Sequence, residues 1–146
     1  MLVKKITTQN DLSIAFKIRT QVFVEEQGVP LEDEFDEFDK LDSQCEHILV
    51  YYNEKIAGTG RIRILNGVGK LERICILKSY RKFGLGKEII KSLEEIAREE
   101  EVTYVKLHGQ TQAEGFYQKL GYQVSSDVFV EDGIPHILMS KSLVDK

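Results

Sequence analysis

The stretch from Leu71 to Ala97, LERICILKSYRKFGLGKEIIKSLEEIA, decides the fold. Its apolar beginning favours a strand, its basic middle carries Gly84 and Gly86, and its end favours an amphipathic helix. The first amides of a helix have no partner within the helix, and the helix dipole makes that end positive. The stretch therefore predicts a site for a phosphate group where the turn opens the helix.

The helix after the turn has the clearest periodicity in the chain. Apolar residues recur at helical spacing, and charged residues fall on the opposite face. The apolar face consists of Leu85, Ile89, Ile90, Leu93, Ile96 and Ala97. A strand follows it, and a strand–helix–strand crossover predicts that the two flanking strands are parallel.

The rest of the chain reads as short strands and a few helices. Strands are expected at Leu2–Thr7, Glu46–Tyr52, Ile56–Leu65, Lys70–Leu77, Val102–Leu107, Tyr122–Val130 and Ile134–Ser140. Hairpin turns are indicated at Asn66-Gly67 and Asp132-Gly133. Further helices are expected from a cap at Asn10 or Asp11 to a stop at Gly28, in the acidic loop that follows, and at Thr111–Leu120.

The totals restrict the class of protein. A chain of 146 residues indicates one domain, residues 1–146. Its two cysteines, Cys45 and Cys75, lie far apart, which favours a reducing, cytoplasmic setting and no metal site. No apolar run is long enough to span a membrane, and the start of the chain has no signal-peptide core. A net charge of −4 argues against nucleic acid as a partner.

The acidic residues are unevenly distributed. Residues 25–42 contain nine acids and one base, so this block carries −8 and the rest of the chain +4. The acids are Glu25, Glu26, Glu32, Asp33, Glu34, Asp36, Glu37, Asp39 and Asp42. Such a block is either a solvated loop or the wall of a pocket that attracts a cationic ligand.

Two common phosphate motifs do not fit the glycine turn. A P-loop requires Ser or Thr where Glu88 stands, and the dinucleotide fingerprint requires a third glycine where Ile89 stands. The two glycines that remain allow the backbone to approach a ligand closely. The bases Arg81, Lys82 and Lys87 can add charge-assisted contacts.

The turn resembles the cofactor-binding turn of a known family. Arg81-x-x-Gly84-x-Gly86 matches the (Gln/Arg)-x-x-Gly-x-(Gly/Ala) signature of the GNAT acyltransferase superfamily, which binds acetyl-CoA. Residues 116–122, FYQKLGY, resemble the FYxKLGY segment of the same superfamily. Residues 19–30, RTQVFVEEQGVP, are similar to the YjcF/ElaA-like branch of small bacterial predicted acetyltransferases.

The resemblance implies a fold and a cofactor site. The fold is an α/β (α+β) GNAT fold: a mixed, mostly antiparallel twisted sheet of about seven strands, flanked by about four helices, with a splayed strand pair at the cofactor site. The strand edge at 74–76 is expected to bind the pantetheine amides, and the turn to bind the pyrophosphate. The residues implied are Ile74, Cys75, Ile76, Arg81, Lys82, Phe83, Gly84, Leu85, Gly86 and Lys87. Where the family often has Asn, either Gln110 or Gln112 is expected to contact the cofactor.

Tyr117 is the residue that the resemblance assigns to protonation of the departing CoA thiolate, although an aromatic on a short helix can also be simply core. Attack by an amine needs a proton acceptor or a water chain. Counting in twos along the strand places Glu72 on the same face as Ile74 and Ile76, which makes Glu72 a candidate base. Further candidates for contact with the acceptor are Arg19, Glu26 and His108.

The function expected is transfer of an acetyl group from acetyl-CoA to a primary amine of a small molecule or peptide, by direct attack in a ternary complex. No metal, nucleic acid or membrane is expected to take part, and homodimers are frequent in this superfamily. Three alternatives remain open: a non-catalytic acyl-CoA-binding or sensing module, an acyltransferase with a longer acyl donor, and a nucleotide-binding module.

Overall fold

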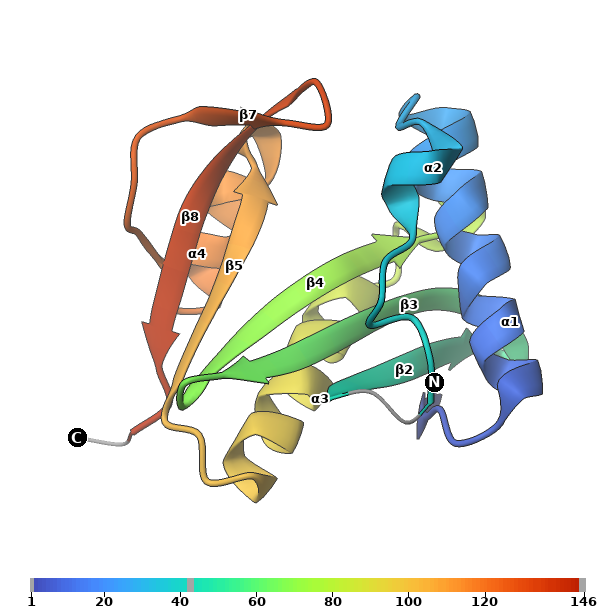
Figure 1. The fold of residues 1–146 in the computed structure, drawn as a ribbon, viewed down its shortest axis with the longest axis horizontal. Coiled ribbons are helices and arrows are strands. Elements are labelled where there is room, and N and C mark those ends of the chain that lie inside the picture. Colours follow the sequence, from blue (N-terminus) through green and yellow to red (C-terminus); the bar gives the residue numbers. More distant parts are fainter. Residues whose placement is uncertain (1, 42–43, 145–146) are drawn as a thin grey trace.

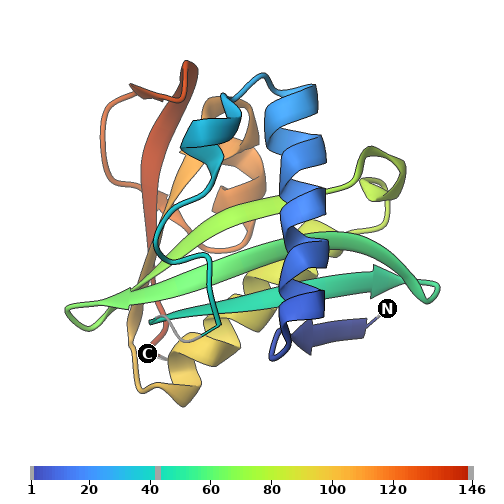
Figure 2. The same ribbon diagram turned by 45° about the vertical axis from the view of Figure 1, so that its right-hand side comes forward.

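The computed structural model describes residues 2–41 and 44–144, which form one open sheet with helices on both faces (Figures 1 and 2). The strand order is β1-β2-β3-β4-β5-β8-β6, and β7 also pairs with β8. The strands are β1 (Leu2–Lys5), β2 (Cys45–Tyr52), β3 (Lys55–Leu65), β4 (Val68–Ile76), β5 (Tyr104–Gln110), β6 (Gln123–Val124), β7 (Phe129–Glu131) and β8 (Ile134–Ser142). All pairings are antiparallel except β4 with β5. The mixed, mostly antiparallel sheet is therefore confirmed.

Within the part of the chain that the structure describes, the sheet has eight strands rather than about seven, because the single strand expected at Tyr122–Val130 is divided into β6 and β7. Between them the Ser126 side chain takes the place of a backbone partner: its hydroxyl oxygen accepts from the Leu138 amide at 2.9 Å. A side chain that satisfies a strand amide lets the chain leave the ladder.

The described residues form four α-helices: α1 (Gln9–Arg19), α2 (Leu31–Glu34), α3 (Leu85–Glu99) and α4 (Glu114–Lys119). The cap of α1 lies two positions before Asn10, the nearer of the two caps expected, because the Thr8 hydroxyl accepts from the Asp11 amide at 3.2 Å. The helix then continues as a π-helical segment, η1 (Thr20–Glu26), before Gly28 takes a left-handed φ of 80°. Segments of π-helix are rare and occur mostly at functional sites.

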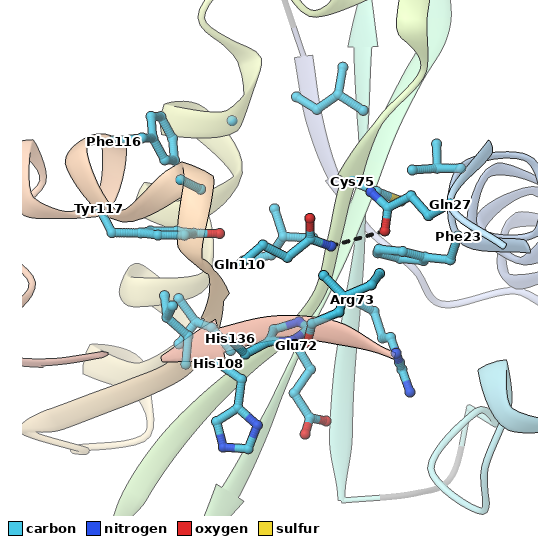
Figure 3. A pocket seen from close by; sticks show the side chains of 18 of the residues that line it. Phe23, Gln27, Glu72, Arg73, Cys75, His108, Gln110, Phe116, Tyr117 and His136 are labelled. Atoms are coloured by element: carbon cyan, nitrogen blue, oxygen red, sulfur yellow. Dashed lines mark hydrogen bonds between the residues drawn. The ribbon is translucent and has the colours of Figure 1, made fainter. Parts of the chain in front are cut away.

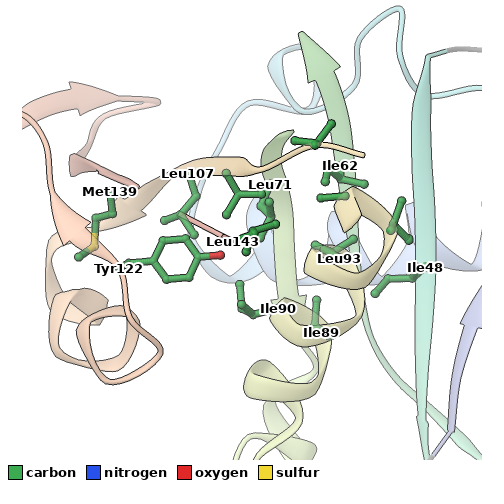
Figure 4. Packing of buried hydrophobic residues seen from close by; sticks show 14 of the residues in the cluster. Ile48, Ile62, Leu71, Ile89, Ile90, Leu93, Leu107, Tyr122, Met139 and Leu143 are labelled. Atoms are coloured by element: carbon green, nitrogen blue, oxygen red, sulfur yellow. The ribbon is translucent and has the colours of Figure 1, made fainter. Parts of the chain in front are cut away.

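Each face of the sheet has its own core. The apolar face of α3 packs against β3 and β4, together with Leu107, Tyr122 and Met139 (Figure 4). On the other face α1 and η1 cover a smaller cluster that includes Leu49 and Cys75. Burial on both faces explains why β3 is continuously buried from Ala57 to Ile62.

The expected hairpins are confirmed. Asn66-Gly67 and Asp132-Gly133 both have positive φ at both residues, as a type I′ turn requires. The second turn folds β7 back on β8, so that this hairpin stands at the same end of the molecule as α2 (Figure 1).

Strands β4 and β5 separate at the centre of the sheet. They pair only from Gly69–Leu71 to Val105–Leu107, while β4 stays bonded to β3 and β5 to β8 up to their far ends. Beyond that point the facing edges of the two strands are not bonded to each other. The splayed pair expected from the family resemblance is therefore confirmed (Figure 1).

Candidate active site

The gap between β4 and β5 contains a cavity of about 550 Å³ (Figure 3). At one end lie the glycine turn at the start of α3 and the aromatic residues of α4. At the other end lie charged and imidazole side chains from β4, β5, β7 and β8. Of the residues predicted for the site, the cavity is lined by Glu72, Ile74, Cys75, Ile76, Arg81, Gly84, Leu85, Gly86, His108, Gln110 and Tyr117. The other candidates, Arg19, Glu26, Lys82, Phe83, Lys87 and Gln112, are not among its lining residues.

The glycine turn has the geometry of an anion cradle. Gly84 caps α3 with a left-handed φ of 72° and without any side-chain cap, which leaves the first amides of the helix available. A Cβ added at Gly86 would lie 3.2 Å from the Phe116 ring, so the glycine leaves room for a ligand to approach the backbone of the turn. Leu85 is 1% exposed and anchors the helix start in the core, so only its backbone faces the cavity. Lys82, Phe83 and Lys87 are exposed, and Phe83 stacks on Tyr52.

Arg81 connects the turn to the end of η1. Its guanidinium donates two hydrogen bonds to the Glu26 carboxylate, at 2.6 and 2.7 Å, and its Nε donates to the Ile76 carbonyl at 2.9 Å. The prediction that Glu26 contacts the acceptor therefore gains no support from the structure. Glu26 instead lies beside the predicted phosphate turn.

Tyr117 lies on the α3 side of the gap, with its ring against Gly109: a Cβ at Gly109 would be 3.0 Å from that ring. Its hydroxyl points into the cavity (Figure 3), and none of the described residues hydrogen-bonds to it. Burial raises the pKa of Tyr117 to about 12, so the phenol keeps its proton at neutral pH. Tyr117 thus packs as a core residue and also presents a proton donor.

A chain of amide side chains crosses the cavity. The Gln110 amide donates to the Gln27 side-chain oxygen at 2.9 Å (Figure 3). Gln112 donates to Gln110 at 2.6 Å. Of the two glutamines proposed for cofactor contact, only Gln110 lines the cavity. Its bond to Gln27 joins β5 to the residue that follows η1.

The prediction that Glu72 shares a strand face with Ile74 and Ile76 is wrong. A β-bulge at Arg73, whose φ is 54°, adds one residue to β4, so that Arg61 pairs with Glu72 but Thr59 with Cys75. The extra residue reverses the alternation of side chains. Ile74 and Ile76 therefore pack on the α3 side, whereas Glu72 lies on the opposite face.

Glu72 is bound by three bases and is poorly suited to accept a proton. Arg61, Arg63 and Lys70 all lie within 3.1 Å of its carboxylate oxygens. Burial alone would raise the pKa of Glu72, but the hydrogen bond from Arg63 and the charges of Arg61 and Lys70 outweigh burial and lower it to about 2. A carboxylate with so low a pKa is a weak base at neutral pH.

Arg19 belongs to a buried ion-pair network rather than to the cavity, so its prediction as a pocket residue is wrong. It is 1% exposed and pairs with Glu34 and Asp39, below the ring of Phe35. Arg61 continues this network to Asp36 and Asp39.

The acidic block is thus not purely solvated, and Glu25, Asp36 and Asp39 line a second pocket beside α1. Three of its members, Glu34, Asp36 and Asp39, pair with these buried arginines. Glu25, Glu26, Glu32, Asp33 and Glu37 are exposed, and Asp42 lies outside the described residues.

Sequence reasoning proposed His108 for the acceptor side but missed the polar cluster around it at the far end of the cavity. His108 Nδ1 lies 3.1 Å from Glu131 Oε1, and His136 Nε2 lies 3.8 Å from Glu131 Oε2. Arg73 lies 3.5 Å from Glu34 and 4.0 Å from Asp132 at the tip of the β7–β8 hairpin. The Asp-Gly turn was the only signal in the sequence for the position of Glu131. It predicts the hairpin that carries Glu131 back toward β5, but it does not indicate that His108 is the partner of Glu131.

Cys75 is a buried thiol whose pKa is raised by burial, so it is poorly suited to act as a nucleophile. Among residues 2–41 and 44–144, no three His, Cys, Asp or Glu side chains gather as a metal site would require. No helix in this part of the chain is both long and apolar enough to cross a membrane.

A mixed sheet split at its centre, with a glycine-capped helix at the split, defines an acyltransferase of the GNAT class. The chain matches the acetyltransferase (GNAT) domain family over residues 14–143 and therefore belongs to that family.

Known relatives agree with this assignment. The chain is 63% identical over 143 residues to the Bacillus subtilis protein YyaT, covering 98% of this chain and 97% of the relative. It is 47% identical over 142 residues to the B. subtilis N-acetyltransferase YjcF, covering 95% of this chain and 99% of the relative. The crystal structure of an acyl-CoA N-acyltransferase from Pseudomonas aeruginosa superimposes with a TM-score of 0.85 at 25% identity, covering 97% of this chain and 99% of that one. The family, and the YjcF-like branch expected from residues 19–30, are confirmed.

Proposed function

We propose that this protein transfers an acetyl group from acetyl-CoA to a primary amine of a small molecule or peptide, by direct attack in a ternary complex. One observation carries the proposal. A single cavity joins an anion cradle, a proton donor and a polar cluster through the gap between β4 and β5. A cofactor that enters from one face can meet an acceptor that enters from the other.

The cofactor half of the proposal follows from backbone groups. The amides that begin α3, from Gly84 to Lys87, would bind the pyrophosphate, with Lys82 and Lys87 adding positive charge nearby. The free edge of β4 at 74–76 would bind the pantetheine amides as an added strand does. Gln110 is the side chain that we propose for a further contact, since it lines the cavity and Gln112 does not.

The chemical half uses Tyr117 and the bulge. Tyr117 would protonate the CoA thiolate as the C–S bond breaks, because its raised pKa keeps the proton available. A backbone N–H on β4 beside the bulge at Arg73 would bind the oxyanion that forms on the thioester carbonyl. One such donor contributes about 3–4 kcal/mol in other enzymes.

Ligand-dependent melting combined with thiol release tests this function. Acetyl-CoA at a hundred times its Kd should stabilise the fold by about 2.7 kcal/mol, which for a chain of this size raises Tm by roughly 5–10 °C. ATP and NAD should not raise Tm. Acetyl-CoA should release thiol with an amine from a panel of polyamines, amino acids, aminoglycosides and peptides.

The alternatives give different results in the same experiment. A binding module would show the rise in Tm without thiol release from any amine. A preference for long acyl-CoA donors would indicate a different acyltransferase. No change in Tm with acetyl-CoA would refute the cofactor assignment itself.

A further inference from the structure

Strand β5 presents two sets of side chains to opposite sides of the gap. Leu107 and Gly109 face the α3 side, where Gly109 contacts the ring of Tyr117. His108 and Gln110 alternate with them and therefore face the other side. There Gln110 bonds to Gln27 after η1, and His108 bonds to Glu131 on β7. The gap thus has a proton donor on one face and an imidazole on the other.

The partner of His108 fixes which nitrogen is free. Because the Glu131 carboxylate can only accept, His108 Nδ1 must donate the hydrogen bond of 3.1 Å between them. A neutral imidazole that carries its proton on Nδ1 has an unprotonated Nε2, which can accept a proton. A carboxylate orients a catalytic histidine in this way in the serine hydrolases.

The neighbouring histidine is held differently. His136 Nδ1 donates to the Ile134 carbonyl at 2.7 Å, and the residue is only 8% exposed. Its Nε2 faces Glu131 Oε2 at 3.8 Å, on the side of the carboxylate that His108 does not use. The Phe129 ring packs against both histidines, with ring centroids 5.1 Å from His108 and 6.1 Å from His136. His108 is therefore the more accessible imidazole of the pair.

We propose that His108 accepts the proton of the attacking amine and that Glu131 is the positioning residue that holds its ring. The proposal rests on the acetyl transfer proposed above. The amine nitrogen forms a bond to the thioester carbonyl carbon and loses one proton to His108 Nε2. The C–S bond breaks, and the thiolate takes a proton from Tyr117. Solvent then removes the proton from His108 and returns one to Tyr117, which leaves an amide and free CoA.

Other ionisable groups at this end of the cavity are less suited to the task. Those that face His108 or line the cavity beside it are Lys70, Glu72, Arg73, Glu131, Asp132 and His136. Glu72 is held by three bases, and Arg73 and Lys70 are cations that have no free site for a proton. Asp132 is paired with Arg73 at 4.0 Å.

Three variants test the assignment, each assayed for acetyl-CoA binding and for thiol release with an amine that the wild-type protein accepts. His108→Ala should lower kcat about 10²–10⁴-fold while acetyl-CoA binding stays within threefold. Added imidazole should restore part of the lost rate, because it can enter the space of the missing ring. His136→Gln is the matched control, and its loss of kcat should be at least tenfold smaller than that of His108→Ala.

The third variant, Glu131→Leu, tests the positioning role through the tautomer of His108. Nitrogen-15 NMR of the neutral ring should show the Nδ1–H form in the wild-type protein and a mixture with the Nε2–H form in the variant. A purely structural role for Glu131 would leave the tautomer unchanged. An Nε2–H tautomer in the wild-type protein would overturn the proposal, because that nitrogen could not accept a proton.

Failure of this inference is distinguishable from failure of the proposed function. If the wild-type protein transfers acetyl groups but His108→Ala keeps more than a third of kcat, the role of His108 is refuted and acetyl transfer stands. Rate loss without any rescue by imidazole also counts against a proton-accepting role. If the wild-type protein releases no thiol with any amine, the proposed function fails, and this inference fails with it.

Discussion

The hydroxyl of Tyr117 is the proton donor of the proposed reaction, and it contributes little to the fold. None of the described residues hydrogen-bonds to it, while the ring packs against Gly109, Phe116 and Tyr122. Removing the hydroxyl therefore separates its chemical role from its packing role, which sequence reasoning could not do.

Tyr117→Phe should lower kcat by about 10²-fold and change acetyl-CoA affinity by less than threefold. The phenol acts only as the C–S bond breaks, and the phenylalanine ring keeps every packing contact. Steady-state kinetics and calorimetry of acetyl-CoA binding measure the two effects. An unchanged kcat would show that the leaving thiolate obtains its proton elsewhere.

Gly86 is the residue at which the turn tolerates least added volume. Gly86→Val should weaken acetyl-CoA binding at least tenfold, because its Cβ would lie 3.2 Å from Phe116 and the side chain would have to displace that ring or the turn. Gly115→Ala is the control, since a Cβ there meets no atom within 4 Å. Equal affinities in the two variants would place the pyrophosphate away from this turn.

At the scale of elements, the pair Glu26–Arg81 connects η1 to the start of α3. The Glu26 carboxylate lies beside the turn at which we propose that phosphates bind. Its negative charge repels the phosphates, and its hydrogen bonds engage the Arg81 guanidinium that could otherwise contact them. Cofactor binding should therefore have to displace or weaken this pair.

Glu26→Gln should strengthen acetyl-CoA binding about threefold or more in low salt, because it removes one negative charge and frees Arg81 for the phosphates. The gain should shrink as salt screens the charges. Glu25→Gln, with the same change of charge at the adjacent residue, should have a smaller effect. Weaker binding by Glu26→Gln would mean that the pair holds the turn in its binding form.

A second element-scale feature is the charged network below β3 and β4. The charge and hydrogen bonds of Arg61, which outweigh the effect of burial, lower the pKa of Asp36 to about 2. The pKa of Glu72 is likewise lowered to about 2. Both folded-state values lie below the ordinary values of 3.8 and 4.5. Their stabilising contribution is therefore complete above about pH 5 and is lost as the pH falls toward 2.

The free energy of unfolding should accordingly fall by roughly 3 kcal/mol between pH 5 and pH 2, as measured by urea titration. Glu72→Gln should reduce this dependence, because the uncharged side chain has no proton to gain. The variant should also be less stable at pH 7, since Arg61 and Arg63 lose a partner. A stability independent of pH over this range would contradict the network.

At the scale of the whole molecule, the features read correctly from sequence are those that depend on local chemistry. The apolar face of α3, the glycine turn and the Asn-Gly and Asp-Gly hairpins each follow from residues within a few positions of one another. Because the family resemblance rests on the same local motifs, it implied the splayed strands that the structure contains.

The features that sequence reasoning missed depend on residues far apart in the sequence or on the β-bulge in β4. Counting in twos placed Glu72 on the wrong face, because nothing in the sequence signals the bulge at Arg73. Arg19 was misplaced because its partners lie 15 and 20 residues away. Glu131 reaches His108 only because the β7–β8 hairpin folds back over β5.

The central claim is that the cavity between β4 and β5 joins acetyl-CoA and an amine in one complex. The most direct test supplies acetyl-CoA with an isotopically labelled acetyl group together with the amine panel, and measures labelled amide and free thiol in the same reaction. We expect amide and thiol to form in equal amounts with at least one amine, and both to fall together in Tyr117→Phe. Acetyl-CoA binding without labelled amide from any amine, or thiol release by hydrolysis alone, would contradict the account.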